Sequence, residues 1–226
     1  MNEQWRTGDQ IGAIHPNVVI FDGVRLAAGV TIFPGSVIGR PPMSTGIVPP
    51  KEYIPDTIIG SGCVIGSNVT IYAGVTLGAN VLIGDGARIR ENTTIGEGSV
   101  VGSNSTIQND AVIGCRVRIV DLSHITAGVT IEDDVFWSVG VLSMNDNRDG
   151  QGLKRMRIGA RAFVGGGALL LPGSDIGAGA MVAAGAVVTH PVAPGSAVRG
   201  VPARLWERES VLATIDGWPV SGTEEP

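Results

Sequence analysis

Aromatic side chains make up only 4% of this 226-residue sequence, and cysteine occurs twice, as Cys63 and Cys115. Two cysteines cannot form the disulfide framework of a small secreted domain. No apolar run approaches the length of a membrane span, and residues 1–16 lack the basic segment and apolar core of a signal peptide. We therefore expect a cytoplasmic protein that is not associated with membranes.

A strong charge of either sign is also missing. Charged residues are 16% of the chain and the net charge is −5, which argues against nucleic acid or an anionic membrane as a partner. Glycine, by contrast, is abundant, and its 34 residues follow no three-residue period, so the chain is not collagen-like. Many backbone positions must therefore adopt a positive φ or approach another segment closely.

Aliphatic residues recur at every sixth position over most of the chain. The main series is Ile59, Ile65, Ile71, Leu77, Ile83, Ile89, Ile95, Val101, Ile107, Ile113, Ile119, Ile125 and Ile131. A second series, displaced by four residues, contains only small residues or valine: Cys63, Val69, Val75, Val81, Ala87, Thr93, Ser99, Ser105, Ala111, Val117, Ser123, Val129 and Val135. The main series also runs from Ile14 to Ile38 and returns from Ile158 to Val188.

A six-residue step excludes an α-helix, because it would spread these side chains over every face of the helix. The step predicts very short strands separated by Gly, Asn or Asp corners, with both series pointing inward. Three such sides close one coil, and successive coils pair in parallel about 4.8 Å apart. We expect residues 1–204 to form one all-β solenoid, followed by a short helix and tail over residues 205–226.

Two segments interrupt the six-residue pattern. Residues 40–56 contain five prolines, which cannot donate to a strand ladder, and residues 143–157 are long, polar and charged. Both are expected to be loops extruded from the solenoid, and either could line a binding site. A further irregularity is Trp137, which falls at an inward position of a narrow interior; the sequence leaves open whether it packs there or faces a ligand.

The glycine-containing repeats, such as "IGSNVT" and "LGANVL", resemble the hexapeptide-repeat family of left-handed parallel β-helix acyltransferases. The resemblance covers about residues 11–204, and the left-handedness is implied by it. The segment "VTIEDDVFWSVGV", followed by Asn145 and Asp146, is most similar to the nucleotide-linked amino-sugar N-acetyltransferases of this family. The resemblance implies a homotrimer that uses acetyl-CoA as co-substrate.

His124, in "LSHITAGVTI", is the main catalytic candidate. It directly precedes inward Ile125, so its side chain should point outward, with Thr106 and Leu142 one coil away. Its setting is similar to that of the catalytic histidine of lipid A-type acyltransferases, which implies a general base. A neutral imidazole, with a pKa near 6.5, suits that role. The alternative is a solvated surface histidine; Asp121 could orient the ring.

The Asn145–Asp146 pair, by resemblance to the amino-sugar enzymes, implies contacts to the acceptor amine, although an Asx-rich turn would have the same sequence. The segment from Gly165 to Arg204 resembles the acyl-CoA end of the family. Resemblance implies that its small residues admit the pantetheine arm and that its arginines bind the nucleotide phosphates: Gly165, Gly166, Gly167, Ala183, Ala184, Arg199, Pro202 and Arg204. Backbone N–H groups there could bind the thioester oxyanion.

We therefore expect an acyl-CoA-dependent N-acyltransferase acting on a nucleotide-linked amino sugar, with His124 as base. Two alternatives remain: an acyl-carrier-protein-dependent acyltransferase of the lipid A type, and a non-catalytic β-helix subunit that binds partners on its flat faces. No metal is predicted, because His15, His124 and His190 cannot supply the closely spaced zinc ligands of the carbonic anhydrases of this fold.

Overall fold

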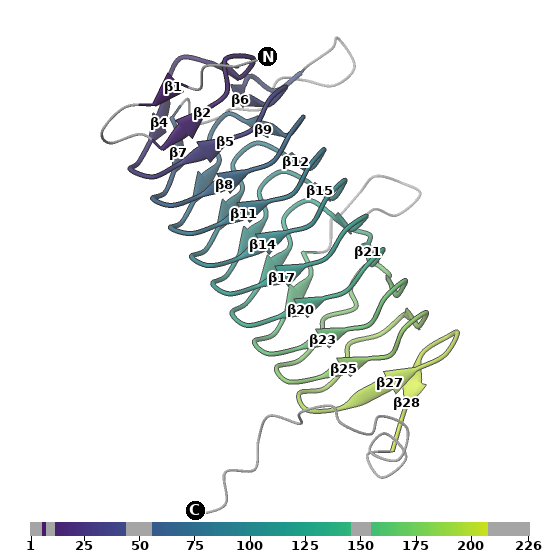
Figure 1. The fold of residues 1–226 in the computed structure, drawn as a ribbon. Coiled ribbons are helices and arrows are strands. Elements are labelled where there is room, and N and C mark those ends of the chain that lie inside the picture. The colour runs from purple at the N-terminus through teal and green to yellow at the C-terminus, as the bar shows by residue number, and fades with distance from the viewer. Residues whose placement is uncertain (1–5, 8–11, 44–55, 146–154, 208–226) are drawn as a thin grey trace, which may run out of the picture.

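The computed structural model describes residues 6–7, 12–43, 56–145 and 155–207, which form a prism of stacked coils with three walls (Figure 1). All elements in these ranges are strands of two to four residues. No helix in the described part of the chain has the length and apolar character needed to cross a membrane. The expected all-β parallel solenoid is confirmed, and its coils are consistent with the left-handed β-helix.

Each wall is one sheet. Wall 1 has twelve strands: β1 (Arg6–Thr7), β2 (Ala13–Ile14), β5 (Thr31–Ile32), β8 (Val64–Ile65), β11 (Leu82–Ile83), β14 (Val100–Val101), β17 (Arg118–Ile119), β20 (Phe136–Trp137), β23 (Phe163–Val164), β25 (Met181–Val182), β27 (Ala197–Arg199) and β28 (Arg204–Leu205). Wall 2 has nine: β3 (Val19–Ile20), β6 (Val37–Arg40), β9 (Thr70–Tyr72), β12 (Arg88–Ile89), β15 (Thr106–Ile107), β18 (His124–Ile125), β21 (Leu142–Ser143), β24 (Leu169–Leu170) and β26 (Val187–Val188). Wall 3 has seven: β4 (Val24–Leu26), β7 (Thr57–Ile59), β10 (Thr76–Leu77), β13 (Thr94–Ile95), β16 (Val112–Ile113), β19 (Thr130–Ile131) and β22 (Arg157–Ile158).

The strands pair in parallel with a register that keeps equivalent residues of successive coils side by side. On wall 2, for example, Thr106 pairs with His124 and Ile107 with Ile125. Only the two end pairs of wall 1, β1–β2 and β27–β28, are antiparallel among the described strands. This register stacks each column of the sequence pattern into a continuous stripe along the prism.

The corners explain the abundance of glycine and asparagine. From Gly62 to Gly140, every sixth residue has a positive φ, and these positions are occupied mainly by Gly and Asn. Both residues tolerate the left-handed conformation better than other types do. Two corners in this series carry unusual residues, Arg116 and Leu122, which adopt φ values of 55° and 60°.

The interior contains both apolar series, and its polar members are satisfied by backbone. Aliphatic residues from Ile59 to Ile131 are fully buried, as are the small residues that alternate with them. The inward Ser99 hydroxyl donates to the carbonyl of Gly114 (2.8 Å), and Thr93 donates to that of Gln108 (3.1 Å). Buried hydroxyls therefore fill the narrow interior without leaving an unpaired polar group.

Both interruptions of the pattern occur at the same edge of the prism. One lies between β6 of wall 2 and β7 of wall 3, and the other between β21 of wall 2 and β22 of wall 3. Residues 44–55 and 146–154 lie outside the described residues. The described ends of both segments therefore place the two insertions along the edge that joins walls 2 and 3.

The C-terminal segment begins differently from the prediction. The expected helix starts near residue 205, but Arg204 and Leu205 form strand β28, which pairs antiparallel with β27. The antiparallel return pairs the outer edge of wall 1 at this end of the prism, so a strand is favoured over a helix there. Residues 208–226 lie outside the described residues.

Trp137 packs inward. Its side chain is 0% exposed, and its indole Nε1 donates to the carbonyl of Val141 at 3.3 Å. In the same coil the next inward position of the main series is Ser143, a much smaller residue than the usual isoleucine. We attribute the fit of the indole to this loss of bulk within one coil.

Candidate functional site

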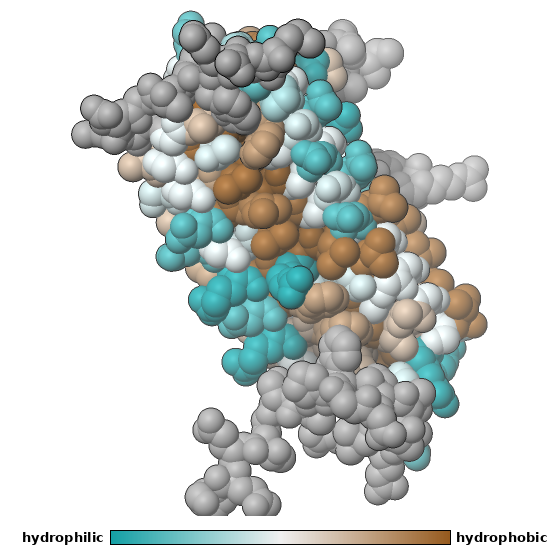
Figure 2. Space-filling model, viewed as in Figure 1, coloured by the Kyte–Doolittle hydropathy of each residue, from teal (hydrophilic) through white to brown (hydrophobic). Residues whose placement is uncertain are grey.

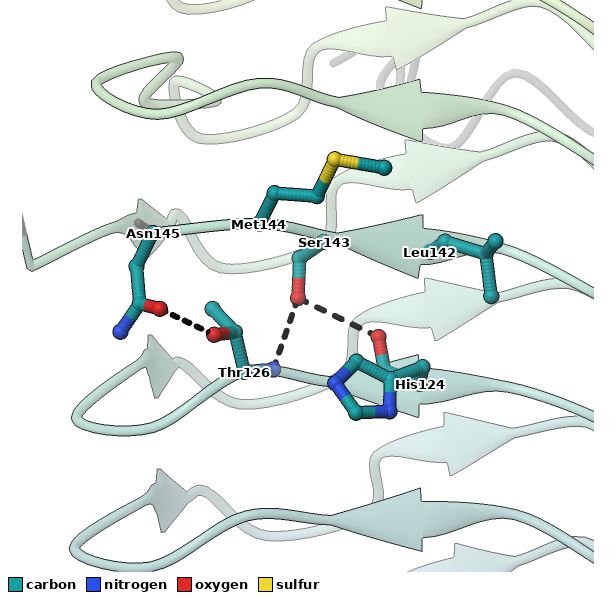
Figure 3. A pocket seen from close by; sticks show the side chains of 6 residues that line it. All are labelled: His124, Thr126, Leu142, Ser143, Met144 and Asn145. Atoms are coloured by element: carbon teal, nitrogen blue, oxygen red, sulfur yellow. Dashed lines mark hydrogen bonds between the residues drawn. The ribbon is translucent and has the colours of Figure 1, made fainter. Parts of the chain in front are cut away.

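A cavity of about 540 Å³ lies on the outer face of wall 2, where the second interruption leaves the prism. It is lined by residues of two successive strands and the chain that follows them: His124, Thr126, Leu142, Ser143, Met144 and Asn145 (Figure 3). His124 and Leu142 are register partners on β18 and β21. The cavity thus joins a titratable ring, an apolar wall and a polar rim.

His124 faces outward between Thr106 and Leu142, as the sequence predicts. The ring is partly buried, and burial lowers its pKa below the ordinary value of 6.5 because desolvation penalises the imidazolium. No hydrogen bond to the imidazole is found within the described residues. Asp121, considered as an orienting partner, instead accepts a hydrogen bond from the backbone N–H of Ser103 at 2.7 Å.

Ser143 fixes the backbone beneath the histidine. On the neighbouring coil, the N–H of Gln108 donates to the carbonyl of Ile125, as is usual along this wall. One coil further, the N–H of Thr126 donates instead to the hydroxyl of Ser143 (3.0 Å), and that hydroxyl donates to the carbonyl of His124 (3.2 Å). This single buried side chain therefore replaces a ladder bond at the point where the chain leaves the wall (Figure 3).

Asn145 is more buried than its expected role suggests. The residue is 3% exposed; its Oδ1 accepts from the hydroxyl of Thr126 (2.5 Å), and its Nδ2 donates to the carbonyl of Ala127 (2.7 Å). These two bonds hold the start of the insertion against the residues that directly follow β18. They leave one amide hydrogen for other contacts at the cavity. Asp146 lies outside the described residues.

The expected acyl-CoA residues form a strip at the edge between walls 1 and 2, near the C-terminal end. Gly165, Ala183 and Arg199 occupy one column of successive coils. A Cβ at Gly165 would lie 2.4 Å from the backbone nitrogen of Ala184, so glycine is required there by coil packing alone. At Gly167 a Cβ would meet no atom within 4 Å, so that glycine leaves open space beside the backbone.

The remaining candidates lie at the end of this strip. Arg199 and Arg204 are register partners on β27 and β28, and Pro202 lies in the turn between them. The guanidinium of Arg199 lies over the ring of Trp206, 4.8 Å from its centroid, whereas Arg204 donates to the carbonyl of Ala203. The structure therefore brings the candidate residues of the strip together, but it places them beyond the His124 cavity in the C-terminal direction.

Sequence reasoning did not single out Thr126 and Leu142 as site residues, and it named Ser143 and Met144 only as part of the interruption at residues 143–157 that could line a site. A signal existed for Ser143, because continuing the six-residue step past Ile131 reaches Trp137 and then a serine. A polar residue in an otherwise aliphatic inward series indicates that its side chain forms a hydrogen bond inside the prism. Within the described ranges, no three His, Cys, Asp or Glu side chains are grouped so that they could hold a metal ion.

Comparison with known protein families matches the repeats directly. Residues 56–91 and 74–109 match the bacterial transferase hexapeptide (six repeats), and residues 155–190 match the hexapeptide repeat of succinyl-transferase. These repeats indicate an acyltransferase. A search of curated proteins found no match.

Solved structures share the fold. A UDP-N-acetylglucosamine acyltransferase from Campylobacter jejuni matches with a TM-score of 0.68 and 17% identity, over 90% of this chain and 79% of that chain. Perosamine N-acetyltransferase from Caulobacter crescentus, solved in complex with CoA and GDP-perosamine, has a TM-score of 0.34 and 18% identity, over 87% and 57% of the two chains. The acetyltransferase domain of PglB from Neisseria gonorrhoeae FA1090, solved in complex with acetyl coenzyme A, has a TM-score of 0.33 and 18% identity, over 85% of this chain and 56% of that chain. At these identities the first match supports the architecture, and the weaker two carry no further weight.

Proposed function

We propose that this chain, whose repeats match the bacterial transferase hexapeptide, transfers an acyl group, most simply acetyl, from acyl-CoA to the amine of a nucleotide-linked amino sugar. The observation that carries the proposal is the cavity on wall 2, where a partly buried, neutral imidazole meets both polar and apolar groups. A merely solvated surface histidine would not line such a cavity.

In the proposed reaction, the acceptor amine attacks the thioester carbonyl while His124 removes a proton from the nitrogen. The tetrahedral intermediate then collapses and releases the thiolate of CoA, which takes up a proton. A base held neutral by burial is ready for this step at pH 7. Asn145 holds the rim of the cavity and can offer its remaining amide hydrogen to the acceptor.

The acyl-CoA is proposed to lie along the strip that includes Gly165, Gly167 and Ala183, with Arg199 and Arg204 near the nucleotide phosphates. Open space beside Gly167 supports this placement, because a pantetheine arm could approach the backbone there. Backbone N–H groups next to the thioester would then stabilise the oxyanion.

We also propose a homotrimer in which a site lies between two prisms. The face of wall 1 that carries β8, β11 and β14 shows an apolar patch at its middle (Figure 2). Val64 and Leu82 contribute to it, with 36% and 42% of their surfaces exposed. A lateral contact between prisms would bury such a patch. A reaction that consumes acyl-CoA and a nucleotide sugar, and releases CoA, also fits the expected cytoplasmic location.

A second candidate is transfer of a longer acyl chain from an acyl carrier protein, as in the lipid A-type enzymes. The observation that favours it is the apolar side of the cavity, formed by Leu142 and Met144 and continued along wall 2 by Leu169 and Leu171. Acyl donors of increasing chain length distinguish the two. Preference for acetyl-CoA supports the first candidate, and preference for a long acyl chain on carrier protein supports the second.

The central experiment measures thiol release from acetyl-CoA with a panel of amino-sugar nucleotides, using the wild type and His124→Ala. Removing a general base should lower the rate by about 10²–10⁴-fold. The matched control is Thr94→Ala, because Thr94 is exposed on β13 of wall 3, away from the cavity and the strip, and should leave the rate unchanged. An unchanged rate in His124→Ala would remove the histidine from the mechanism.

A further inference from the structure

The outer face of wall 2 changes character at His124. On the N-terminal side of the histidine, the outward positions are polar and include three arginines: Thr106, Gln108, Arg88, Arg90, Thr70, Tyr72 and Arg40. On the C-terminal side they carry Leu142, Met144, Leu169, Leu171 and Val187. His124 and Thr126 therefore lie at the boundary between a basic half and an apolar half of one wall.

Arg90 is held in place within the basic half. Its Nε and Nη2 donate to the two carboxylate oxygens of Glu91, at 2.7 and 2.9 Å, and the Glu91 side chain is only 2% exposed. The Arg90 guanidinium also lies over the buried ring of Tyr72, 5.1 Å from its centroid. A bidentate pair against an aromatic ring fixes the orientation of a guanidinium. The remaining Nη1 of Arg90 donates to Oε1 of Gln108 at 3.5 Å, so Arg90 acts as a fixed support.

Two further arginines add charge that no carboxylate in the described part of the chain offsets. Arg40 lies on the same Tyr72 ring, 5.6 Å from its centroid, and donates to the sulfur of Met43. Arg88 is exposed and has no ion-pair partner among the described residues. In contrast, Arg116 on another edge is paired with Asp134. The basic half of wall 2 is thus locally positive on a chain whose net charge is −5.

The arginines of the basic half lie close enough to His124 to contact the same acceptor molecule. The strands carrying Arg88 and His124 are two steps apart on wall 2, which corresponds to about 10 Å at the usual strand spacing. An arginine side chain can cover part of that distance. The remaining space suits a sugar ring whose amine faces the imidazole and whose phosphoryl group faces the arginines.

We propose that Arg88 and Arg40, with Arg90 as a fixed support, bind the diphosphate of a nucleoside diphosphate-linked acceptor on the N-terminal side of His124. This inference rests on the proposed function for the identity of the acceptor. It assigns the acceptor to the basic half of the wall, so that its phosphates set the register of the amine against the imidazole. Guanidinium groups suit this task because their paired N–H groups match phosphate oxygens.

The test is calorimetric titration of UDP into the protein without any acyl donor, with uridine as the uncharged counterpart. Arg88→Gln should weaken UDP binding by about tenfold or more, as expected for loss of a charge-assisted contact, and leave any uridine binding unchanged. Arg40→Gln should act in the same direction. The matched control is Arg25→Gln, an exposed arginine on wall 3, which should bind UDP as the wild type does.

Equal UDP affinity in the wild type and Arg88→Gln would overturn the proposal, as would a wild type that does not bind UDP. Weakening of UDP binding by Arg25→Gln to the same extent would also overturn it, because the effect would then reflect overall charge. Since binding is measured without acyl-CoA, a protein that binds UDP through Arg88 and transfers no acyl group would leave this site standing while the proposed reaction fails.

Discussion

At the scale of single residues, burial rather than a partner sets the chemistry of His124. Desolvation lowers the pKa of the ring, and no carboxylate within hydrogen-bonding distance, among the described residues, opposes that effect. In serine-protease-like sites a carboxylate orients the base and stabilises its protonated form. Here burial favours the neutral imidazole, which is the form that can accept a proton from the acceptor amine.

The pH dependence of the reaction follows from this direction of shift. The base is active when neutral, so kcat/KM should rise with pH along a limb whose midpoint lies below pH 6.5, because burial lowers the His124 pKa below its ordinary value. A pH–rate profile of the wild type measures this limb. A limb centred clearly above pH 6.5 would show that a neighbouring negative charge controls the ring instead.

The free energy of unfolding should also depend on the protonation of His124, in the direction expected for a histidine whose pKa is lowered by folding. The unfolded chain binds a proton at a higher pH than the folded one, so the folded state loses stability as pH falls through 6.5 toward the lower folded pKa. Replacing His124 with Gln removes this dependence. Comparing urea midpoints of the two proteins between pH 7 and pH 5 provides a control that needs no substrate.

At the scale of elements, each corner repeats one backbone conformation, and the sequence does not always match it. Asn68, Asn80 and Asn104 adopt a positive φ at a low steric cost, whereas Leu122 does so at 60° with 60% of its surface exposed. An exposed leucine gains little from burial at that corner. We infer that Leu122 retains some strain that an asparagine would relieve.

Leu122→Asn should therefore stabilise the protein by about 0.5–1 kcal/mol, because Asn tolerates the left-handed region better than leucine does. The measurement is the midpoint of urea unfolding. The matched control is Val112→Asn on β16, where another exposed aliphatic residue lies in extended backbone. There the same substitution should destabilise, since asparagine is disfavoured in strands. Destabilisation at both positions would contradict the strain argument.

The two insertions show how elements position a site. Both leave the prism at the edge between walls 2 and 3, and Ser143 and Asn145 fasten the start of the second to β18 and the residues that directly follow it. The sequence indicates where the repeat stops, since the hexads end there. Counting hexads between the two departures also places both at one edge, because a whole number of three-sided coils separates them.

At the scale of the whole molecule, the prism is a stack in which each coil contacts mainly its neighbours. Stability in such a solenoid is close to a sum of coil and interface contributions. Among the residues that the structure describes, Trp137 is the largest fully buried side chain, and it lies in the coil that also carries Ser143. The packing of that coil therefore connects the N-terminal and C-terminal parts of the stack, and supports the cavity of His124.

Trp137→Ala should destabilise the protein by about 3–5 kcal/mol, because it removes a large side chain from a closely packed interior. Urea unfolding measures the loss. Phe136→Ala serves as the control: Phe136 lies on the same strand but faces outward against Phe163, so its removal should cost much less. Equal costs for the two substitutions would mean that the indole is not a packing element of the core.

The sequence by itself determined the architecture, because a six-residue period has one packing solution: short parallel strands with small residues in a narrow interior. It also predicted that His124 faces outward between Thr106 and Leu142, since the register of a coil follows from counting. Tertiary structure alone decided the inward packing of Trp137, the strand at Arg204–Leu205 and the buried hydrogen bonds of Asn145. These outcomes depend on contacts between residues of different coils and on which polar atoms meet there, and a one-dimensional pattern does not contain that information.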